Sequence, residues 1–128
     1  MLRHPQFLKD LVTGNAGVLA AIHVSSEGLV LGTSPGVDRD EADHWAAVMA
    51  ALQAVSSRGA EIIGRCAAEA GPWGHSVVEV RSGSTLILVG AGGNSMLAVV
   101  CGKTAKLGDI GARLIEVADS PLSMAVAA

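Results

Sequence analysis

The chain contains two short motifs whose residue types could bind a phosphate or a nucleotide. Gly102-Lys103-Thr104 resembles the end of a P-loop, which requires the pattern G-x-x-x-x-G-K-[ST]. The first glycine of that pattern would be residue 97, which is Leu97, so the backbone cannot wrap a phosphate. The run Gly90–Ser95 approaches G-x-G-x-x-G, but it ends in serine and leads into a strand pattern instead of a helix. Both motifs are therefore interpreted as turns.

The acidic residues and the histidines also lack the spacing that metal binding needs. Asp38-x-Asp40-Glu41-x-Asp43 begins like a calcium loop, but it has neither the glycine at the sixth position nor the closing glutamate. The four histidines fall on different predicted elements, with no HExxH spacing: His4, His23, His44 and His75. We predict no metal site.

Cysteine chemistry is equally unsupported. Cys66 and Cys101 are far apart in the sequence and form no CxxC motif, so we predict two buried, reduced thiols. A thiol enzyme would need a base placed beside one of them, and no such base is indicated. We therefore predict a protein without catalytic residues or cofactor.

Composition indicates one globular domain. Of the 128 residues, 50% are hydrophobic and 16% are charged. A net charge of −3 and only three aromatic residues argue against nucleic-acid binding. Ser82–Gly102 is uncharged throughout, but the turn Gly92–Ser95 at its centre favours two buried strands over a membrane span. We expect a cytoplasmic domain over residues 1–118, followed by a flexible tail over 119–128.

The order of the predicted elements is α-β-β-α-β-β-β-α. Hydrophobic periodicity and turn residues place strands at 18–25, 29–34, 74–81, 85–92 and 96–102. Helices are predicted at 4–13, 38–59 and 105–118, with the second weakening near 56–59 and continuing for a few turns through 61–70. We predict an α+β fold: a five-stranded, mostly antiparallel sheet, with the long helix on one face and the N- and C-terminal helices on the other.

The long predicted helix has two apolar faces. Asp38 and Glu41 form a capping-box pattern at its start. One predicted arc, assigned to the core, contains Trp45, Val48, Met49, Leu52 and Val55. The opposite stripe contains Ala47, Ala50, Ala51 and Ala54. A solvent-exposed stripe normally carries charged residues, so the alanines indicate either close approach of another helix or a surface selected for helix propensity.

The first of these readings predicts a homodimer. Two copies of the alanine stripe could pack antiparallel about a two-fold axis between Ala50 and Ala51. Asp43 would then lie opposite Arg58 of the second copy, and this ion pair would fix the register.

The sequence resembles the roadblock/dynein light-chain domains, and within them the bacterial, MglB-like branch found beside small GTPases in actinomycetes. The resemblance covers roughly residues 5–118. It rests on the element order, on Ala16-Gly17-Val18 before the first strand, on the hairpin Ser26–Leu31, and on the helix start at 38–43. Two departures are Ala16, where proline is common, and Glu27, where aspartate is common.

This resemblance implies a non-catalytic homodimer whose long helices pair and whose sheets join through the third strand, about His75–Arg81, which includes Val78 and Val80. It also implies a Ras-like small GTPase as partner, whose switch loops the dimer would bias as an activator or scaffold in a bacterial signalling or polarity system. The implied GTPase contacts are Leu31, Arg39, Asp40 and His44. Arg39 or Arg58 could act as an arginine finger, and a sensor kinase could join the assembly. The alternative is a small-molecule sensor of the PAS or profilin type.

Overall fold

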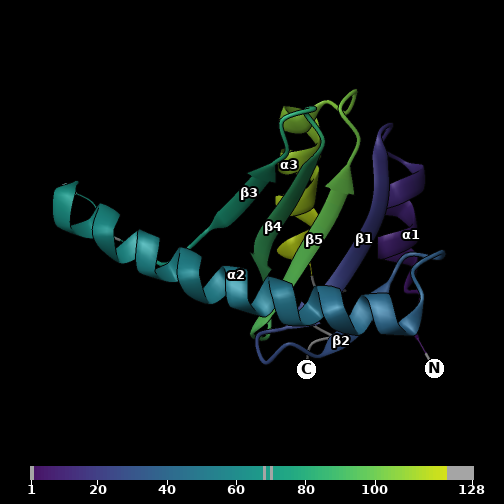
Figure 1. Cartoon of the computed structure of the whole chain (residues 1–128), viewed down its shortest axis with the longest axis horizontal. Helices are drawn as coiled ribbons and strands as arrows, with labels where there is room; N and C mark the ends of the chain where they lie inside the picture. Colours follow the sequence, from purple (N-terminus) through teal and green to yellow (C-terminus); the bar gives the residue numbers. More distant parts are fainter. Residues whose placement is uncertain (1, 68, 70, 121–128) are drawn as a thin grey trace.

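The computed structural model describes residues 2–67, 69 and 71–120, and an antiparallel five-stranded sheet lies at its centre (Figure 1). The strand order is β2-β1-β5-β4-β3. The elements are α1 (Gln6–Thr13), β1 (Val18–Ser25), β2 (Val30–Thr33), α2 (Arg39–Cys66), β3 (His75–Glu79), β4 (Thr85–Ala91), β5 (Ser95–Cys101) and α3 (Leu107–Ala118). The predicted fold class and element order are confirmed. The predicted tail lies largely outside the described residues.

The sheet has an apolar core on each face because its central strands are apolar on both sides. On one face, Leu97 and Val99 of β5 pack with Leu8 of α1 and Leu114 of α3. On the other face, alternate residues of the same strands pack against α2, as Ala98 does. Figure 1 shows α1 and α3 behind the sheet and α2 in front of it.

Helix α2 begins as predicted and runs further without interruption. The Glu41 backbone N–H donates to Asp38 Oδ1 at 2.8 Å, which caps the helix. The predicted weakening near residues 56–59 is wrong, because α2 is continuous from Arg39 to Cys66. A single glycine such as Gly59 costs a helix only about 1 kcal/mol. The Gln53 side chain also donates to Ser57 Oγ, one turn later.

The predicted core face of α2 is partly wrong. Met49 is buried as predicted, but Val48 is 47% exposed and Val55 is 70% exposed. The helix instead turns Ala42 and Ala46 toward the sheet, and both are fully buried. Small side chains let the helix axis approach the strands closely, and this rotation moves the larger apolar residues onto the flank of the helix.

One edge of the sheet is covered by another segment of the chain, and the other is open. Residues ahead of α1 lie along β2, where the Thr33 backbone N–H donates to the Arg3 carbonyl oxygen at 2.9 Å. The His4 ring contacts the Thr33 carbonyl oxygen at 3.0 Å. No described segment pairs with the outer side of β3. This strand is shorter than predicted, because it covers residues 75–79 of the predicted 74–81. The open edge of the sheet is therefore β3.

His23 is a buried polar residue at the centre of β1. Its Nε2 lies 2.8 Å from Ser95 Oγ, which in turn donates to the Gly92 carbonyl oxygen at 2.6 Å. Because that bond uses the only hydroxyl proton of Ser95, Nε2 of His23 must be the donor. Its Nδ1 is buried, and no residue in the described part of the chain forms a hydrogen bond with it. Burial lowers the pKa of His23 to about 4.

We expect this histidine to make the protein acid-sensitive. In the unfolded chain His23 takes up a proton as the pH falls below 6.5, whereas in the folded chain it does so only near 4. The contribution of His23 to the free energy of unfolding is therefore fully present above pH 6.5, and about 3 kcal/mol of it is lost as the pH falls to 4. Urea unfolding across this range measures the loss. His23→Leu should flatten the curve, while His44→Gln, at an exposed position of α2, should keep it; an unchanged slope in His23→Leu would contradict the assignment.

Candidate functional site: an open apolar face beside α2

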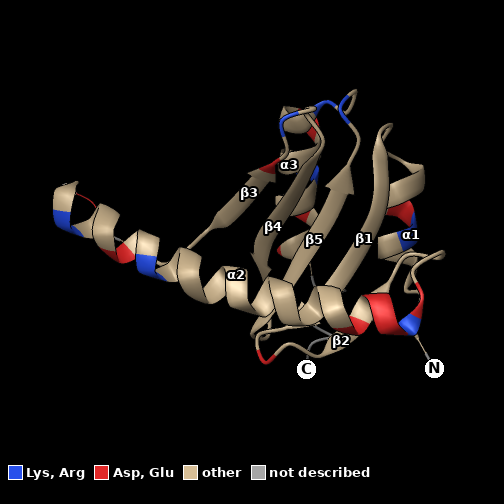
Figure 2. Cartoon of the chain, in the orientation of Figure 1, with Lys and Arg blue, Asp and Glu red and all other residues tan. Residues whose placement is uncertain are grey.

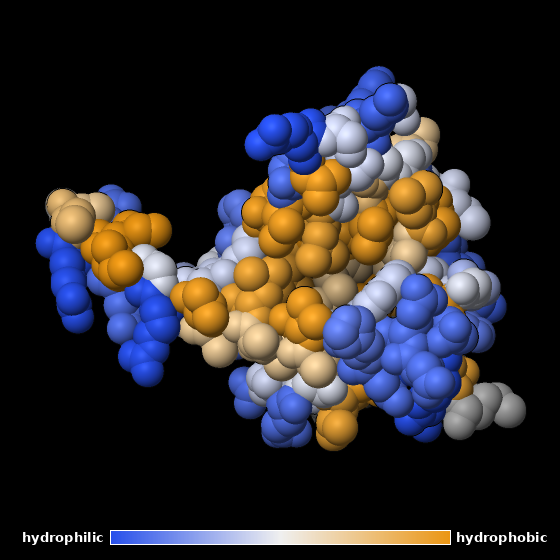
Figure 3. All heavy atoms as spheres, viewed as in Figure 1, coloured by the Kyte–Doolittle hydropathy of each residue, from blue (hydrophilic) through white to orange (hydrophobic). Residues whose placement is uncertain are grey.

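The α2 side of the sheet is only partly covered. Helix α2 crosses one end of the strands, and a continuous apolar surface extends over the sheet beside it (Figure 3). A hollow of about 310 Å³ lies between the helix flank and the strands. Trp45 and Val48 line it from α2, and Leu86 and Val100 line it from β4 and β5. Apolar surface of this extent on a small domain is typical of a protein–protein contact.

The second half of α2 extends past β3 and away from the sheet, as Figure 1 shows. We call this part, residues 57–66 of α2, the α2 overhang. It carries Ile62 and Ile63, which are 61% and 62% exposed. The overhang and the open sheet face are thus two unpaired apolar surfaces in one chain.

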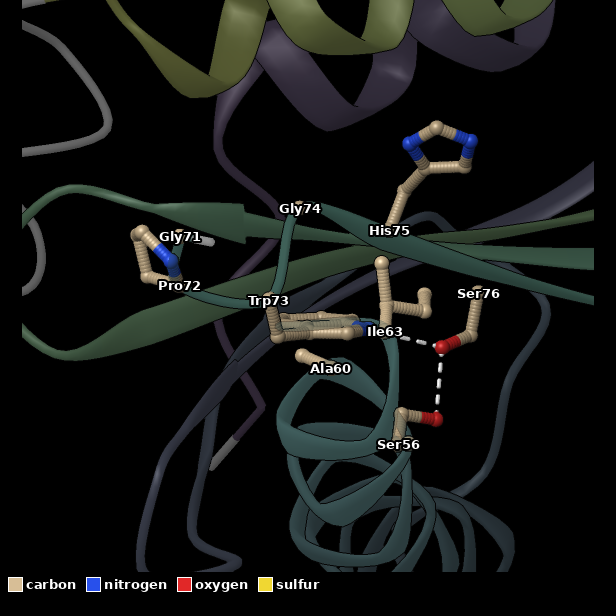
Figure 4. Close-up of a pocket in the computed structure, with 10 residues that line it drawn as sticks. Ser56, Ala60, Ile63, Gly71, Pro72, Trp73, Gly74, His75 and Ser76 are labelled. Carbon is tan, nitrogen blue, oxygen red and sulfur yellow. Dashed lines mark hydrogen bonds between the residues drawn. The ribbon is translucent and has the colours of Figure 1, made fainter. Parts of the chain in front are cut away.

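A second hollow, of about 530 Å³, lies where the overhang passes the start of β3 (Figure 4). Ala60 and Ile63 of α2 form one side, and the segment from Gly71 to Ser76 forms the other. The Trp73 ring lies over Gly90 of β4, where a side chain would come within 3.6 Å of the ring. Trp73 thus forms the wall of the hollow nearest the sheet. In Figure 4 the His75 side chain points away from α2.

Three side chains connect this hollow to α2. Trp73 Nε1 donates to Ser76 Oγ at 2.8 Å, and Ser76 Oγ donates to Ser56 Oγ at 2.7 Å. These bonds join the start of β3 to α2 at the root of the overhang (Figure 4). This set is not visible in the sequence, because Ser56 and Ser76 are twenty residues apart and no motif connects them.

The alanine stripe lies on a different side of α2 from the open face. Ala47, Ala51 and Ala54 are exposed, whereas Ala50 is half-buried. A side chain at Gly28, in the β1–β2 turn, would lie 3.6 Å from the Ala50 Cβ, so this turn already covers Ala50. The predicted alanine seam stays a prediction.

The two charged residues of that seam each have a partner within the chain. Asp43 pairs with Arg39 at 3.4 Å, and Arg58 pairs with Glu61 at 3.5 Å. All four side chains are solvent-exposed, so the pairs are weak. They leave the predicted Asp43–Arg58 contact with a second copy untested.

The residues expected to contact a GTPase lie near one end of α2. Arg39, Asp40 and His44 are exposed on its first two turns, and Leu31 is half-buried in β2. Figure 2 shows that acidic residues gather at this start of α2, while basic residues gather on the loops at the opposite end of the sheet. Val78 and Val80, expected in the dimer interface, lie on β3 and just after it.

The described residues contain no cluster of three metal-ligating side chains. Within the same part of the chain, no helix combines the length and apolar character needed to cross a membrane. Cys101 is buried, and burial raises the pKa of its thiol. The prediction that Cys66 is also buried is wrong: it is exposed at the end of the overhang, where no sheet lies beneath the helix.

We predict that Ser76 holds Trp73 in place. Ser76→Ala removes both hydrogen bonds and should lower the free energy of unfolding by about 1 kcal/mol. In a Trp45→Phe background, the Trp73 fluorescence should also become more accessible to acrylamide. Ser57→Ala is the matched control, because the Ser57 hydroxyl accepts from Gln53 of its own helix and does not join the Trp73–Ser76–Ser56 set. Equal quenching in both variants would contradict this role.

The chain matches the family model described as the Roadblock/LC7 domain over residues 6–101. None of the curated proteins matches it at a significant level. A solved Roadblock/LC7 domain from Streptomyces avermitilis is 29% identical, with a TM-score of 0.75, covering 89% of this chain and 93% of that one.

Two solved MglB structures share the fold. The gliding protein MglB from Thermus thermophilus is 20% identical, with a TM-score of 0.72, covering 95% of this chain and 86% of that chain. An MglB described with a tetrameric arrangement is 21% identical, with a TM-score of 0.73, covering 95% and 85%.

Proposed function

The chain belongs to the Roadblock/LC7 domain family, and from that premise we propose that it is a homodimeric, non-catalytic regulator or scaffold of a Ras-like small GTPase. One observation supports the self-association: each chain has both an apolar helix overhang and an uncovered apolar sheet face. Both surfaces expose large apolar side chains in the single chain, and each would be removed from water by contact with the other.

The open edge of β3 supports a specific arrangement of the two copies. Two β3 strands can pair antiparallel about a two-fold axis and join the sheets. Because the axis reverses the direction of α2, the overhang of each copy would then extend over the open sheet face of the other. Val55 and Ile62, exposed in the single chain, would become buried. The β2 edge is less available, since the segment at Arg3 already bonds to Thr33.

This arrangement leaves the outer side of each α2 free for another protein. Ala47, Ala51 and Ala54 face away from the sheet, and the acidic start of the helix adjoins them. On this proposal, the exposed alanines and the charged residues beside them contact the switch loops of the GTPase. Binding that favours one switch conformation would change GTP hydrolysis or localise the GTPase, without nucleotide chemistry by this chain.

The self-association predicts a monomeric variant. Val48→Asp places a charge in the hollow beside Trp45, and the charge would be buried without a partner in the dimer. Analytical ultracentrifugation should show a dimer for the parent and a monomer for Val48→Asp. Ala51→Asp is the matched control on the outer side of α2: it should remain dimeric in this arrangement, whereas a monomeric Ala51→Asp protein would favour the alanine seam predicted from the sequence. A dimeric Val48→Asp protein would place the contact elsewhere.

The GTPase role is tested with purified Ras-like GTPases from the same cell. We expect one of them to bind the parent chain in a nucleotide-dependent manner, measured by calorimetry with GDP and with a GTP analogue. Asp40→Lys should weaken this binding by about tenfold, whereas Glu116→Lys, on α3 behind the sheet, should not. GTP hydrolysis with and without the chain then separates a regulator from a scaffold. Failure of every such GTPase to bind would refute the role.

A further inference from the structure

We propose that the hollow beside Trp73 is a socket that receives Val80 of a second copy. The inference rests on the proposed self-association and assigns to it a register that the family membership does not supply. Three observations support it: the backbone groups of β3 that face the open edge, the His75–Glu79 pairing at the two ends of the strand, and the size and lining of the hollow.

Alternate residues of β3 direct their backbone groups outward. The Gly74 carbonyl oxygen accepts from the Gly90 N–H at 3.2 Å, and the Val80 N–H donates to the Ser84 carbonyl oxygen at 3.0 Å. Even-numbered residues thus turn their backbone groups toward β4 and its turn. Because these groups alternate along a strand, the odd-numbered residues His75, Val77 and Glu79 turn theirs to the open edge.

These outward groups specify how two copies of β3 can pair. A two-fold axis at Val77 places His75 of each copy opposite Glu79 of the other, and it uses all five residues of both strands. His75 and Glu79 are exposed, so this pairing also sets an imidazole beside a carboxylate at each end. A shift by two residues would remove this pairing and leave one end of each strand without a partner.

The same register brings Val80 of one copy opposite Gly74 of the other. Val78 pairs with Leu86, which packs in the α2-side core, so Val78 and Val80 both point to the α2 side. Val80 is 54% exposed in the single chain. Gly74 has no side chain, and nothing lies within 4 Å of where its Cβ would be. The Val80 side chain of the second copy would therefore enter the space beside Trp73.

The hollow fits this occupant in size and character. Its volume of about 530 Å³ exceeds that of one valine side chain and leaves room for Val78 of the second copy beside Ser76. Its walls include the Trp73 ring, Ala60 and Ile63, which are apolar contacts for a valine. The Trp73–Ser76–Ser56 hydrogen bonds hold the Trp73 wall in place before association, so this side chain needs little ordering on binding.

Disulfide trapping tests the register directly. In an antiparallel pair, residues whose backbone groups face away from each other have Cα atoms about 4.5 Å apart, which a disulfide can bridge. In a Cys66→Ser background, Gly74→Cys and Val80→Cys are made as separate proteins and mixed before oxidation. We expect a covalent dimer from the mixture and none from either protein alone, because like positions lie far apart in this register. Gly74→Cys mixed with Val78→Cys is the control for a shifted register.

A second measurement monitors the socket itself. In a Trp45→Phe background, Trp73 fluorescence should shift to longer wavelength as dilution separates the dimer. Val80→Ser should raise the dimer dissociation constant by about tenfold, while Val77→Ser, on the α3 side of the same strand, should have a smaller effect.

The two ways of failing are distinct. A parent chain that sediments as a monomer at all concentrations would overturn both the self-association and the socket. A dimeric parent whose Gly74→Cys and Val80→Cys mixture does not cross-link, or whose Trp73 emission is the same in monomer and dimer, would overturn the socket alone and assign the hollow to a different occupant.

Discussion

The fold depends on a sheet whose central strands are apolar on both faces. Strands β4 and β5 contain almost no polar side chain, so each face must be removed from water. Helices α1 and α3 together cover one face. On the other face there is only α2, and a single helix about 10 Å wide cannot cover five strands spaced about 4.8 Å apart. The uncovered apolar surface follows from this difference in coverage.

Much of the fold could be predicted from local signals. The β1–β2 and β4–β5 hairpins follow from Gly28 and from Gly92–Ser95 between apolar runs, and the start of α2 follows from Asp38. The rotation of α2 about its axis could not be predicted. Its apolar residues span more than half of its circumference, so periodicity alone could not select the face that meets the sheet. The small residues Ala42 and Ala46 determined it, because they allow the closest approach to the strands.

The candidate site was predictable only in outline. Composition and the absence of motif spacing led away from catalysis, and the family resemblance implied a contact between copies through the third strand. The hollow beside Trp73 depends on a bond between Ser56 and Ser76 that forms only when α2 and β3 come together. His23 was likewise assigned no specific role, because its burial depends on the position of α1 over β1 and on Ser95 in a distant strand. Both features arise from tertiary contacts that residue spacing does not encode.

The α2 overhang has a consequence for local dynamics. Beyond its contact with the start of β3, the end of this helix is held mainly by its own backbone hydrogen bonds, and short isolated helices are marginal in water. Residues near Ile62 should therefore exchange their amide hydrogens with solvent far faster in the separated chain than those near Met49, which is buried against the sheet. Covering the overhang would slow that exchange. The end of α2 is thus a local reporter of assembly, and in the separated chain it is also where a protease would cut first.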